Sequence, residues 1–223
     1  MGHAETIAFV REDHFEVVSN NAASDYFVSW IAVGGERQVN RLQSGDMVMH
    51  WEQPPKLEAH ERVLLNLVRF AEPPNLQLTP VWHTGVGHAE TIIELGTSHA
   101  VIASNNVAQT YRPMFLATGT IAGRVPRNEF AVGDVLVRTG VRRDLRSALK
   151  DIDLSVPPER SLGENAEFAE PPVVVVTPFW EGRTGVGHAE TINRISTTHV
   201  QTASGNAGSD YGVSWIAMGP RRR

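Results

Sequence analysis

A histidine and a glutamate two positions apart recur in this sequence and could do chemistry together. The pairs are His3/Glu5, His88/Glu90 and His188/Glu190, each inside the repeated hexapeptide Gly-His-Ala-Glu-Thr-Ile. In a β-strand, residues two positions apart point to the same face, with about 7 Å between their backbones. The two side chains of each pair can therefore meet, or converge on a third group.

Three interpretations of these pairs remain open. The first is a packing and pairing motif between repeats, in which hydrogen bonds satisfy polar groups as they become buried. The second is a site for a polyhydroxyl ligand, with histidine donating and glutamate accepting hydrogen bonds. The third is a zinc or iron site, since imidazole and carboxylate suit both metals. No fixed third ligand accompanies each pair, so we expect no metal and no other cofactor.

A Ser-x-Asn motif follows each pair at an expected junction between strand and loop, and ends in Asn106 or Asn206. Its simpler interpretation is an Asx or ST turn. Its functional interpretation is a loop at the end of a sandwich whose amides and hydroxyls bind a ligand. Asp210 lies in the same loop, and Tyr211 stands at the start of the next strand, where stacking on that ligand is expected.

Motifs of the common enzyme classes do not occur in the chain. There is no Gly-x-Ser-x-Gly, no Walker loop and no dinucleotide fingerprint. The sequence therefore predicts a protein that is not an enzyme.

Internal repeats organise the elements that must position these residues. The hexapeptide starts at Gly2, Gly87 and Gly187, and the similarity continues without a gap to Gly34, Gly119 and Gly219. Upstream of the second and third copies, Phe-Ala-Glu-Pro-Pro and Thr-Pro-x-Trp also recur. Such self-similarity indicates a repeated structural unit. The chain divides into a half-repeat, residues 1–34, and two full repeats, residues 35–119 and 120–223.

The strand pattern predicts an all-β fold of tandem six-stranded antiparallel sandwiches, because short β-rich runs alternate with turn signals. The half-repeat holds only the last three strands, at 3–10, 15–19 and 26–33, and three strands cannot bury two faces. It must pair with another part of the chain or with a neighbouring chain, unless the sequence begins inside a longer gene product. A helical turn is expected around Leu145 to Leu154.

Composition narrows the classes of partner. The 223 residues carry a formal net charge of −5, which disfavours nonspecific binding to nucleic acid or to anionic membranes. No apolar run approaches the roughly 20 residues needed to cross a bilayer. The chain contains no cysteine and shows no signal peptide. We expect a cytoplasmic or non-classically exported protein.

Several segments resemble the H-type lectins, the family of snail agglutinins and discoidin C-terminal domains. The run Tyr211 to Ala217 resembles their closing strand, Pro171 to Val175 resembles the strand after their Pro-rich entry, and Arg41 to Gly45 resembles their opening Arg-x-Gln-Ser-Gly. The similarity covers most of residues 41–119 and 120–223, together with the final half-domain pattern in residues 2–34.

The resemblance implies a six-stranded sandwich, trimeric assembly and binding of galactose or N-acetylgalactosamine between protomers. The family holds the sugar with an acidic residue near the first strand, a basic residue on the middle strand and an aromatic-His pair before the last strand. Asp46 and Asp134 lie near the first position, and His88 and His188 near the second. At the third, Ser104-Asn105 and Ser204-Gly205 replace the aromatic-His pair.

The leading prediction is a multivalent carbohydrate-binding protein in which the linked copies imitate the family's trimer or help to build a larger ring. Its candidate ligands to glycans are Asp46, Asp134, His88, Glu90, His188, Glu190, Asn106, Asn206, Asp210 and Tyr211. The alternative is a structural assembly module that uses the same sandwich without sugar, which the loss of the aromatic-His pair favours. A His/Glu metalloenzyme is the third possibility.

Overall fold

The computed structural model describes residues 4–11, 13–21, 24, 27–33, 41–52, 62–82, 88–104, 106, 111–161, 166–180 and 188–222. In these ranges the chain forms strands and one 3-10 turn, Pro158–Arg160, so the all-β prediction is confirmed. Short runs of Val, Ile, Thr and aromatic residues favour strands, and Gly and Pro between them favour turns. None of the described residues form a helix long and apolar enough to cross a membrane.

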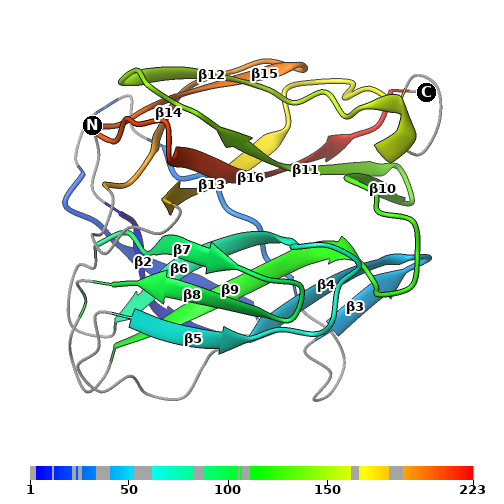
Figure 1. Cartoon of the computed structure of the whole chain (residues 1–223). Helices are drawn as coiled ribbons and strands as arrows, with labels where there is room; N and C mark the ends of the chain where they lie inside the picture. Colours follow the sequence, from blue (N-terminus) through cyan, green and yellow to red (C-terminus); the bar gives the residue numbers. More distant parts are fainter. Residues whose placement is uncertain are drawn as a thin grey trace.

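The strands fall into three groups that follow the sequence repeats (Figure 1). Unit 1 comprises β1 (Thr6–Val10) and β2 (Phe15–Val18), followed by residues 27–33. Unit 2 comprises β3 (Arg41–Ser44), β4 (Met47–Glu52), β5 (Arg62–Asn66), β6 (Asn75–Trp82), β7 (Thr91–Leu95), β8 (His99–Ala103) and β9 (Tyr111–Thr120). Unit 3 comprises β10 (Glu129–Val132), β11 (Val135–Arg143), β12 (Leu149–Asp153), β13 (Val173–Trp180), β14 (Thr191–Ile195), β15 (His199–Ala203) and β16 (Tyr211–Pro220).

Each full unit has seven strands where the sequence predicts six. The segment from Arg41 to His50 reads as one strand, but the structure turns it back on itself at Gly45 and Asp46. Gly45 has a φ of 57°, a left-handed conformation that glycine adopts without strain. Gly133, with a φ of 61°, makes the same turn between β10 and β11.

Two further expectations are wrong. Strand β12 stands where the helical turn is expected. It pairs with β15, and both Ile152 and Leu154, two residues further on, lie in the core of unit 3. The last strand expected in the half-repeat does not form: residues 27–33 join no sheet of the described part of the chain. Tyr26, which was expected to begin it, lies outside the described residues.

Each full unit is a sandwich of two layers with a hydrophobic cluster between them. In unit 2, β3, β4, β9 and β6 form one layer, and β5, β8 and β7 form the other. Val48, Leu76 and Phe115 of the first layer pack in one cluster with Ile92 and Ile102 of the second. Unit 3 repeats this plan, with β10, β11, β16 and β13 against β12, β15 and β14.

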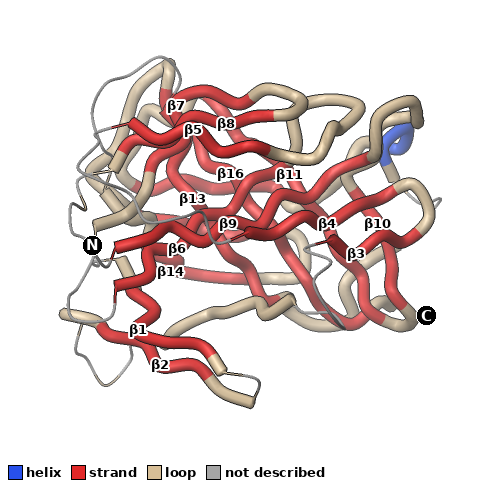
Figure 2. The backbone as a smooth tube through the Cα atoms, turned by 90° about the horizontal axis from the view of Figure 1, so that it is seen from below, coloured by secondary structure: helices blue, strands red, loops and turns tan. Residues whose placement is uncertain are grey.

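Neighbouring units share sheets. Strand β7 of unit 2 runs parallel to β13 of unit 3, with Ile92 opposite Phe179. Strand β1 of unit 1 runs parallel to β6 of unit 2, with Ile7 opposite Val81. Antiparallel pairing therefore holds within units, whereas the joints between units are parallel. The resulting sheets have the strand orders β2-β1-β6-β9-β4-β3 and β10-β11-β16-β13-β7-β8-β5 (Figures 1 and 2).

One hydrophobic cluster contains the same repeat position from all three units. Ile31, Leu116 and Ile216 align, because 116 minus 31 is 85 and 216 minus 116 is 100, the spacings of the hexapeptides. All three belong to, or pack against, the cluster formed by Met47, Met49, Phe130, Val137 and Ile216. The units thus meet through their faces as well as through their sheet edges.

Candidate functional site

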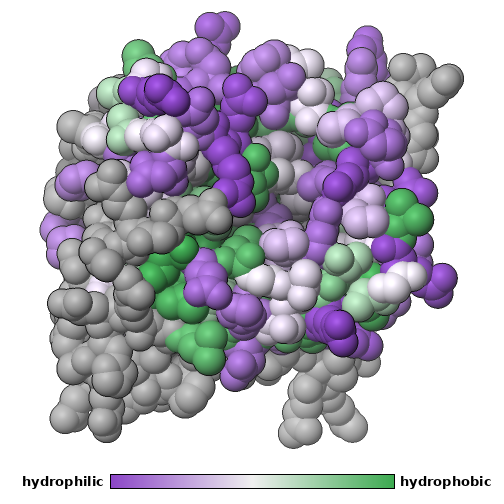
Figure 3. All heavy atoms as spheres, viewed as in Figure 1, coloured by the Kyte–Doolittle hydropathy of each residue, from purple (hydrophilic) through white to green (hydrophobic). Residues whose placement is uncertain are grey.

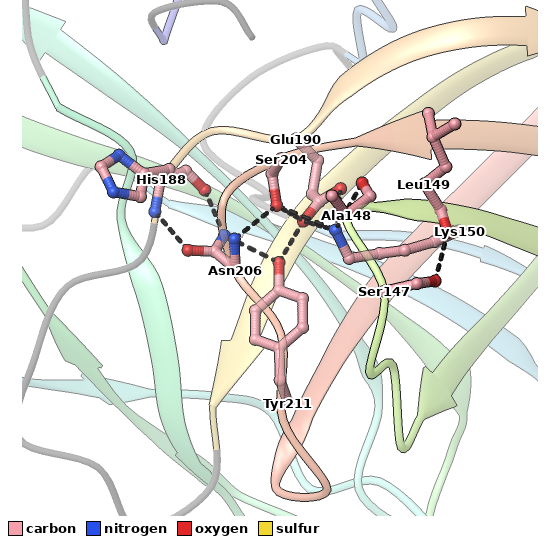
Figure 4. A network of polar contacts seen from close by, with 9 residues as sticks. All are labelled: Ser147, Ala148, Leu149, Lys150, His188, Glu190, Ser204, Asn206 and Tyr211. Atoms are coloured by element: carbon pink, nitrogen blue, oxygen red, sulfur yellow. Dashed lines mark hydrogen bonds and ion pairs between the residues drawn. The ribbon is translucent and has the colours of Figure 1, made fainter.

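A buried polar network in unit 3 gathers four of the ten candidate residues: His188, Glu190, Asn206 and Tyr211 (Figure 4). The Glu190 side chain has no exposed surface, and neither has that of Lys150, whose Nζ lies 3.3 Å from Glu190 Oε1. Ser204 Oγ and Tyr211 Oη both donate hydrogen bonds to the same Oε1. The carboxylate is therefore held by one cation and two hydroxyl groups.

Asn206 connects this network to the backbone before β14. Its Oδ1 accepts from the His188 amide at 2.8 Å, and its Nδ2 donates to the His188 carbonyl at 2.7 Å and to Tyr211 Oη at 3.0 Å. Its own amide donates to Ser204 Oγ at 3.0 Å, which is the ST-turn geometry expected of Ser-x-Asn. The motif thus ties the start of β14 to the end of β15.

A related network occurs in unit 2, where the described residues place no cation beside the glutamate. Glu90 Oε1 accepts from Ser104 Oγ at 3.0 Å and from Asn106 Nδ2 at 2.8 Å, and Asn106 binds the His88 backbone as Asn206 binds that of His188. In unit 3, Lys150 pairs across the sheet with Thr202. The position in unit 2 that corresponds to Thr202 is Ile102, and it pairs with Val63, so Val63 stands where unit 3 has Lys150. Glu90 Oε2 is buried and has no hydrogen-bond partner in the described part of the chain.

In unit 1, Glu5 repeats the arrangement. Its Oε1 accepts from Ser19 Oγ at 2.8 Å and from Asn21 Nδ2 at 2.7 Å. The glutamate of the hexapeptide therefore bonds to the Ser-x-Asn motif in every copy. In units 1 and 2 the glutamate bonds to serine and asparagine, and in unit 3 it bonds to Ser204, Tyr211 and Lys150. These contacts stand where the sequence suggested pairing with the histidine.

Burial raises the pKa of two groups in these networks, Glu90 and Tyr211. Desolvation raises the pKa of Glu90 from 4.5 to about 7, although the hydrogen bonds from Asn106 and Ser104 lower it part of the way back. Desolvation, followed by the charge of Glu190, raises the pKa of the Tyr211 hydroxyl above its ordinary value. Tyr211 therefore stays a donor to Glu190 at every physiological pH.

Glu90 should make the stability of the protein depend on pH. Below about pH 4.5 both the folded and the unfolded chain hold this proton; between about pH 4.5 and 7 only the folded chain holds it. Stability is then lost as pH rises through this window, by about 3 kcal/mol. Urea unfolding at pH 5 and pH 8 should show that Glu90→Gln removes this slope. Glu170→Gln, at an exposed carboxylate, serves as the control and should keep the slope. If Glu90→Gln kept the slope as well, Glu90 would not be its source.

The predicted ligand residues do not share one accessible site. Glu90, Asn106 and Asn206 are buried, and Tyr211 is fully buried, so its ring has no face on which a ligand could stack. The expected stacking of a ligand on Tyr211 is therefore wrong, whereas the other candidate contacts to a sugar stay predictions. In this structure the buried groups hold the ends of strands. His88, His188 and Asp210 are exposed beside this network.

Asp46 and Asp134 lie at the other end of the sandwiches. Each occupies a hairpin turn, and the residues after them, Met47 and Val135, pair with Thr120 and Pro220 at the far ends of β9 and β16. Tyr211 begins β16, so about 30 Å separates its end of the strand from that of Asp134, at roughly 3.3 Å per residue. Asp46 pairs with Arg124 at 3.3 Å on the surface. The aspartates and the histidines therefore cannot hold one sugar ring within a unit.

Lys150 is the member of the network that sequence reasoning missed. It lies in the segment where the sequence predicts a helical turn. In the structure this segment is a strand in which exposed and buried residues alternate, and Lys150 occupies a buried position. Groups of three or more His, Asp or Glu side chains that could hold a metal ion are absent from the described ranges. Comparison with protein-family models, with curated proteins and with solved structures finds no match for this chain.

Proposed function

We propose that this protein is a structural assembly module, a non-enzymatic building element of a particle or appendage, in which β-sandwich units extend one another's sheets. The observation that carries the proposal is the parallel joint, which occurs twice in the same register, at Ile92/Phe179 and at Ile7/Val81. At the joint between units 2 and 3, the strand of unit 3 also contributes a residue to the core of unit 2.

Phe179 supports this reading most directly. It belongs to β13 of unit 3, yet its side chain is 2% exposed and packs in the core cluster of unit 2 with Ile92 and Ala100. Independent binding domains on a string would keep separate cores. A shared core instead suits a protein whose purpose is rigid extension.

Polar contacts between the sheet faces support the same conclusion. Asn75 Nδ2 of unit 2 donates to the Gly140 carbonyl at 2.8 Å and to the Trp215 carbonyl at 2.7 Å in unit 3. Thr177 Oγ1 donates to Gln77 Oε1 at 3.0 Å across the same interface. These buried hydrogen bonds fix the orientation of the two units, because breaking one leaves a buried polar group without its partner.

Scanning calorimetry tests the proposal. If units 2 and 3 share their cores, they should unfold in one transition, with equal calorimetric and van't Hoff enthalpies. Two resolved transitions would reject the structural module as described.

Carbohydrate binding stays a prediction beside this proposal, and a glycan array separates the two. We expect no saturable signal, because the carboxylates and amides that would contact a sugar are buried in the strand-end networks. Saturable binding to galactose or N-acetylgalactosamine glycans, competed by free sugar, would favour the lectin. The exposed His88 and His188 would then be the first residues to substitute.

A further inference from the structure

Unit 1 exposes side chains whose equivalents are buried in the other units. Val28 is 41% exposed and Trp30 is 57% exposed. Their equivalents in unit 3, Val213 and Trp215, are 0% and 4% exposed. The difference marks an apolar surface that the repeat normally covers.

The full units show what covers it. In unit 3, β16 lies between β11 and β13, and in unit 2, β9 lies between β4 and β6. Residues 27–33 occupy the equivalent place in the repeat but have no strand on either side within the described chain. They lack the half-unit that β3–β6 and β10–β13 provide elsewhere.

Strand β14 also lacks a neighbour that its equivalents in the other units have. Its equivalents, β1 and β7, each pair in parallel with a strand that carries Thr-Pro-x-Trp, namely β6 and β13. Among the described strands, β14 pairs only with β15. Its other edge therefore has no partner strand in the described part of the chain, whereas the surface at the top of Figure 3 is largely hydrophilic.

The two incomplete surfaces belong to one arrangement. Ile31 and Leu116 pack against the cluster that contains Ile216, so equivalent positions of the three units lie close together. Figures 1 and 2 both show β14 at the same end of the molecule as the β1–β2 hairpin. Strand β6 pairs with both β1 and β9, and β13 pairs with both β7 and β16. By the same rule, the strand that would pair with β14 would also pair with residues 27–33.

We propose that the gap between β14 and residues 27–33 binds a four-strand half-unit of the same repeat, equivalent to β10–β13. Its last strand pairs in parallel with β14 and antiparallel with residues 27–33, which closes a ring of three units. The inference rests on the proposed structural function. A second copy of this chain does not supply the strand from β6 or β13, because each already has a neighbour on both sides. The occupant is therefore a further polypeptide segment with the same Thr-Pro-x-Trp chemistry.

An extended chain tests the proposal. A second copy of residues 121–187 is placed between Met1 and His3, in place of Gly2, so that it joins unit 1 as residues 121–187 join unit 3. Because the protein has no cysteine, Val28→Cys reports the exposure of unit 1 through its rate of thiol labelling. We expect labelling to slow about 100-fold in the extended chain, since it then requires local opening. Amide exchange at residues 192–195 should slow as well, because β14 gains a partner.

Two controls make the result decisive. Val213→Cys, buried in unit 3, should label slowly in both chains and shows that each is folded. An extension that carries Val174→Asp in the added copy only should leave Val28→Cys exposed, because Val174 is a core residue of its half-unit. Fast labelling of Val28→Cys in the intact extension, or unchanged exchange at residues 192–195, overturns ring closure. A single calorimetric transition in that same chain would leave the structural function standing.

Discussion

Lys150→Met should destabilise the folded protein by about 3–5 kcal/mol at neutral pH, because it leaves the Glu190 carboxylate buried without its cation. Both side chains are 0% exposed, and Lys150 Nζ lies within 3.5 Å of both Glu190 oxygens. Nζ also donates to Ser204 Oγ at 2.9 Å and to the Ala148 carbonyl at 3.3 Å. Chemical denaturation of the full chain measures the loss.

The double variant Lys150→Met/Glu190→Gln provides the matched comparison. Replacing both charges removes the uncompensated ion, so most of the lost stability should return. Unit 2 already has this arrangement in part, since Val63 stands where unit 3 has Lys150. A loss below about 1 kcal/mol in Lys150→Met, the range of exposed ion pairs, would show that the network is open to water.

Phe179→Ala should cost about 3–5 kcal/mol, the range for removing a buried aromatic side chain. Phe179 is 2% exposed and packs in the core of unit 2. The distance from its ring centroid to Arg143 Cζ is 4.7 Å. Because the residue belongs to unit 3 but fills unit 2, the loss should reach both units. Hydrogen exchange of the β5 and β8 amides should therefore accelerate, together with a lower temperature of the single thermal transition.

Val174→Ala is the comparison for this second variant. Val174 is also in β13 and fully buried, but it packs in the core of unit 3 with Leu136 and Val200. Its loss should act first on β12 and β15. If Phe179→Ala left the exchange of β5 and β8 unchanged, the shared core would not carry the stability of unit 2.

The repeat and the all-β class could be predicted from the chain alone, because both depend on local order. Alternating Val, Ile and Thr between Gly and Pro favours strands regardless of what lies nearby. The Ser-x-Asn turn belongs to the same class: the Asn106 amide bonds to Ser104 Oγ two residues away, and short-range geometry is sufficient to form it. The glutamate of the hexapeptide was recognised as important for the same reason, since it recurs at fixed spacing.

Only the tertiary structure decided where those elements meet. The joint between Ile92 and Phe179 spans 87 residues (179 minus 92), and nothing in either strand specifies a parallel neighbour from another unit. Lys150 and Glu190 became partners because β12 and β14 both flank β15, although 40 positions separate them in the chain. Local patterns fix backbone conformation, whereas the pairing of sheets and the burial of a charge depend on the free energy of the whole packed core.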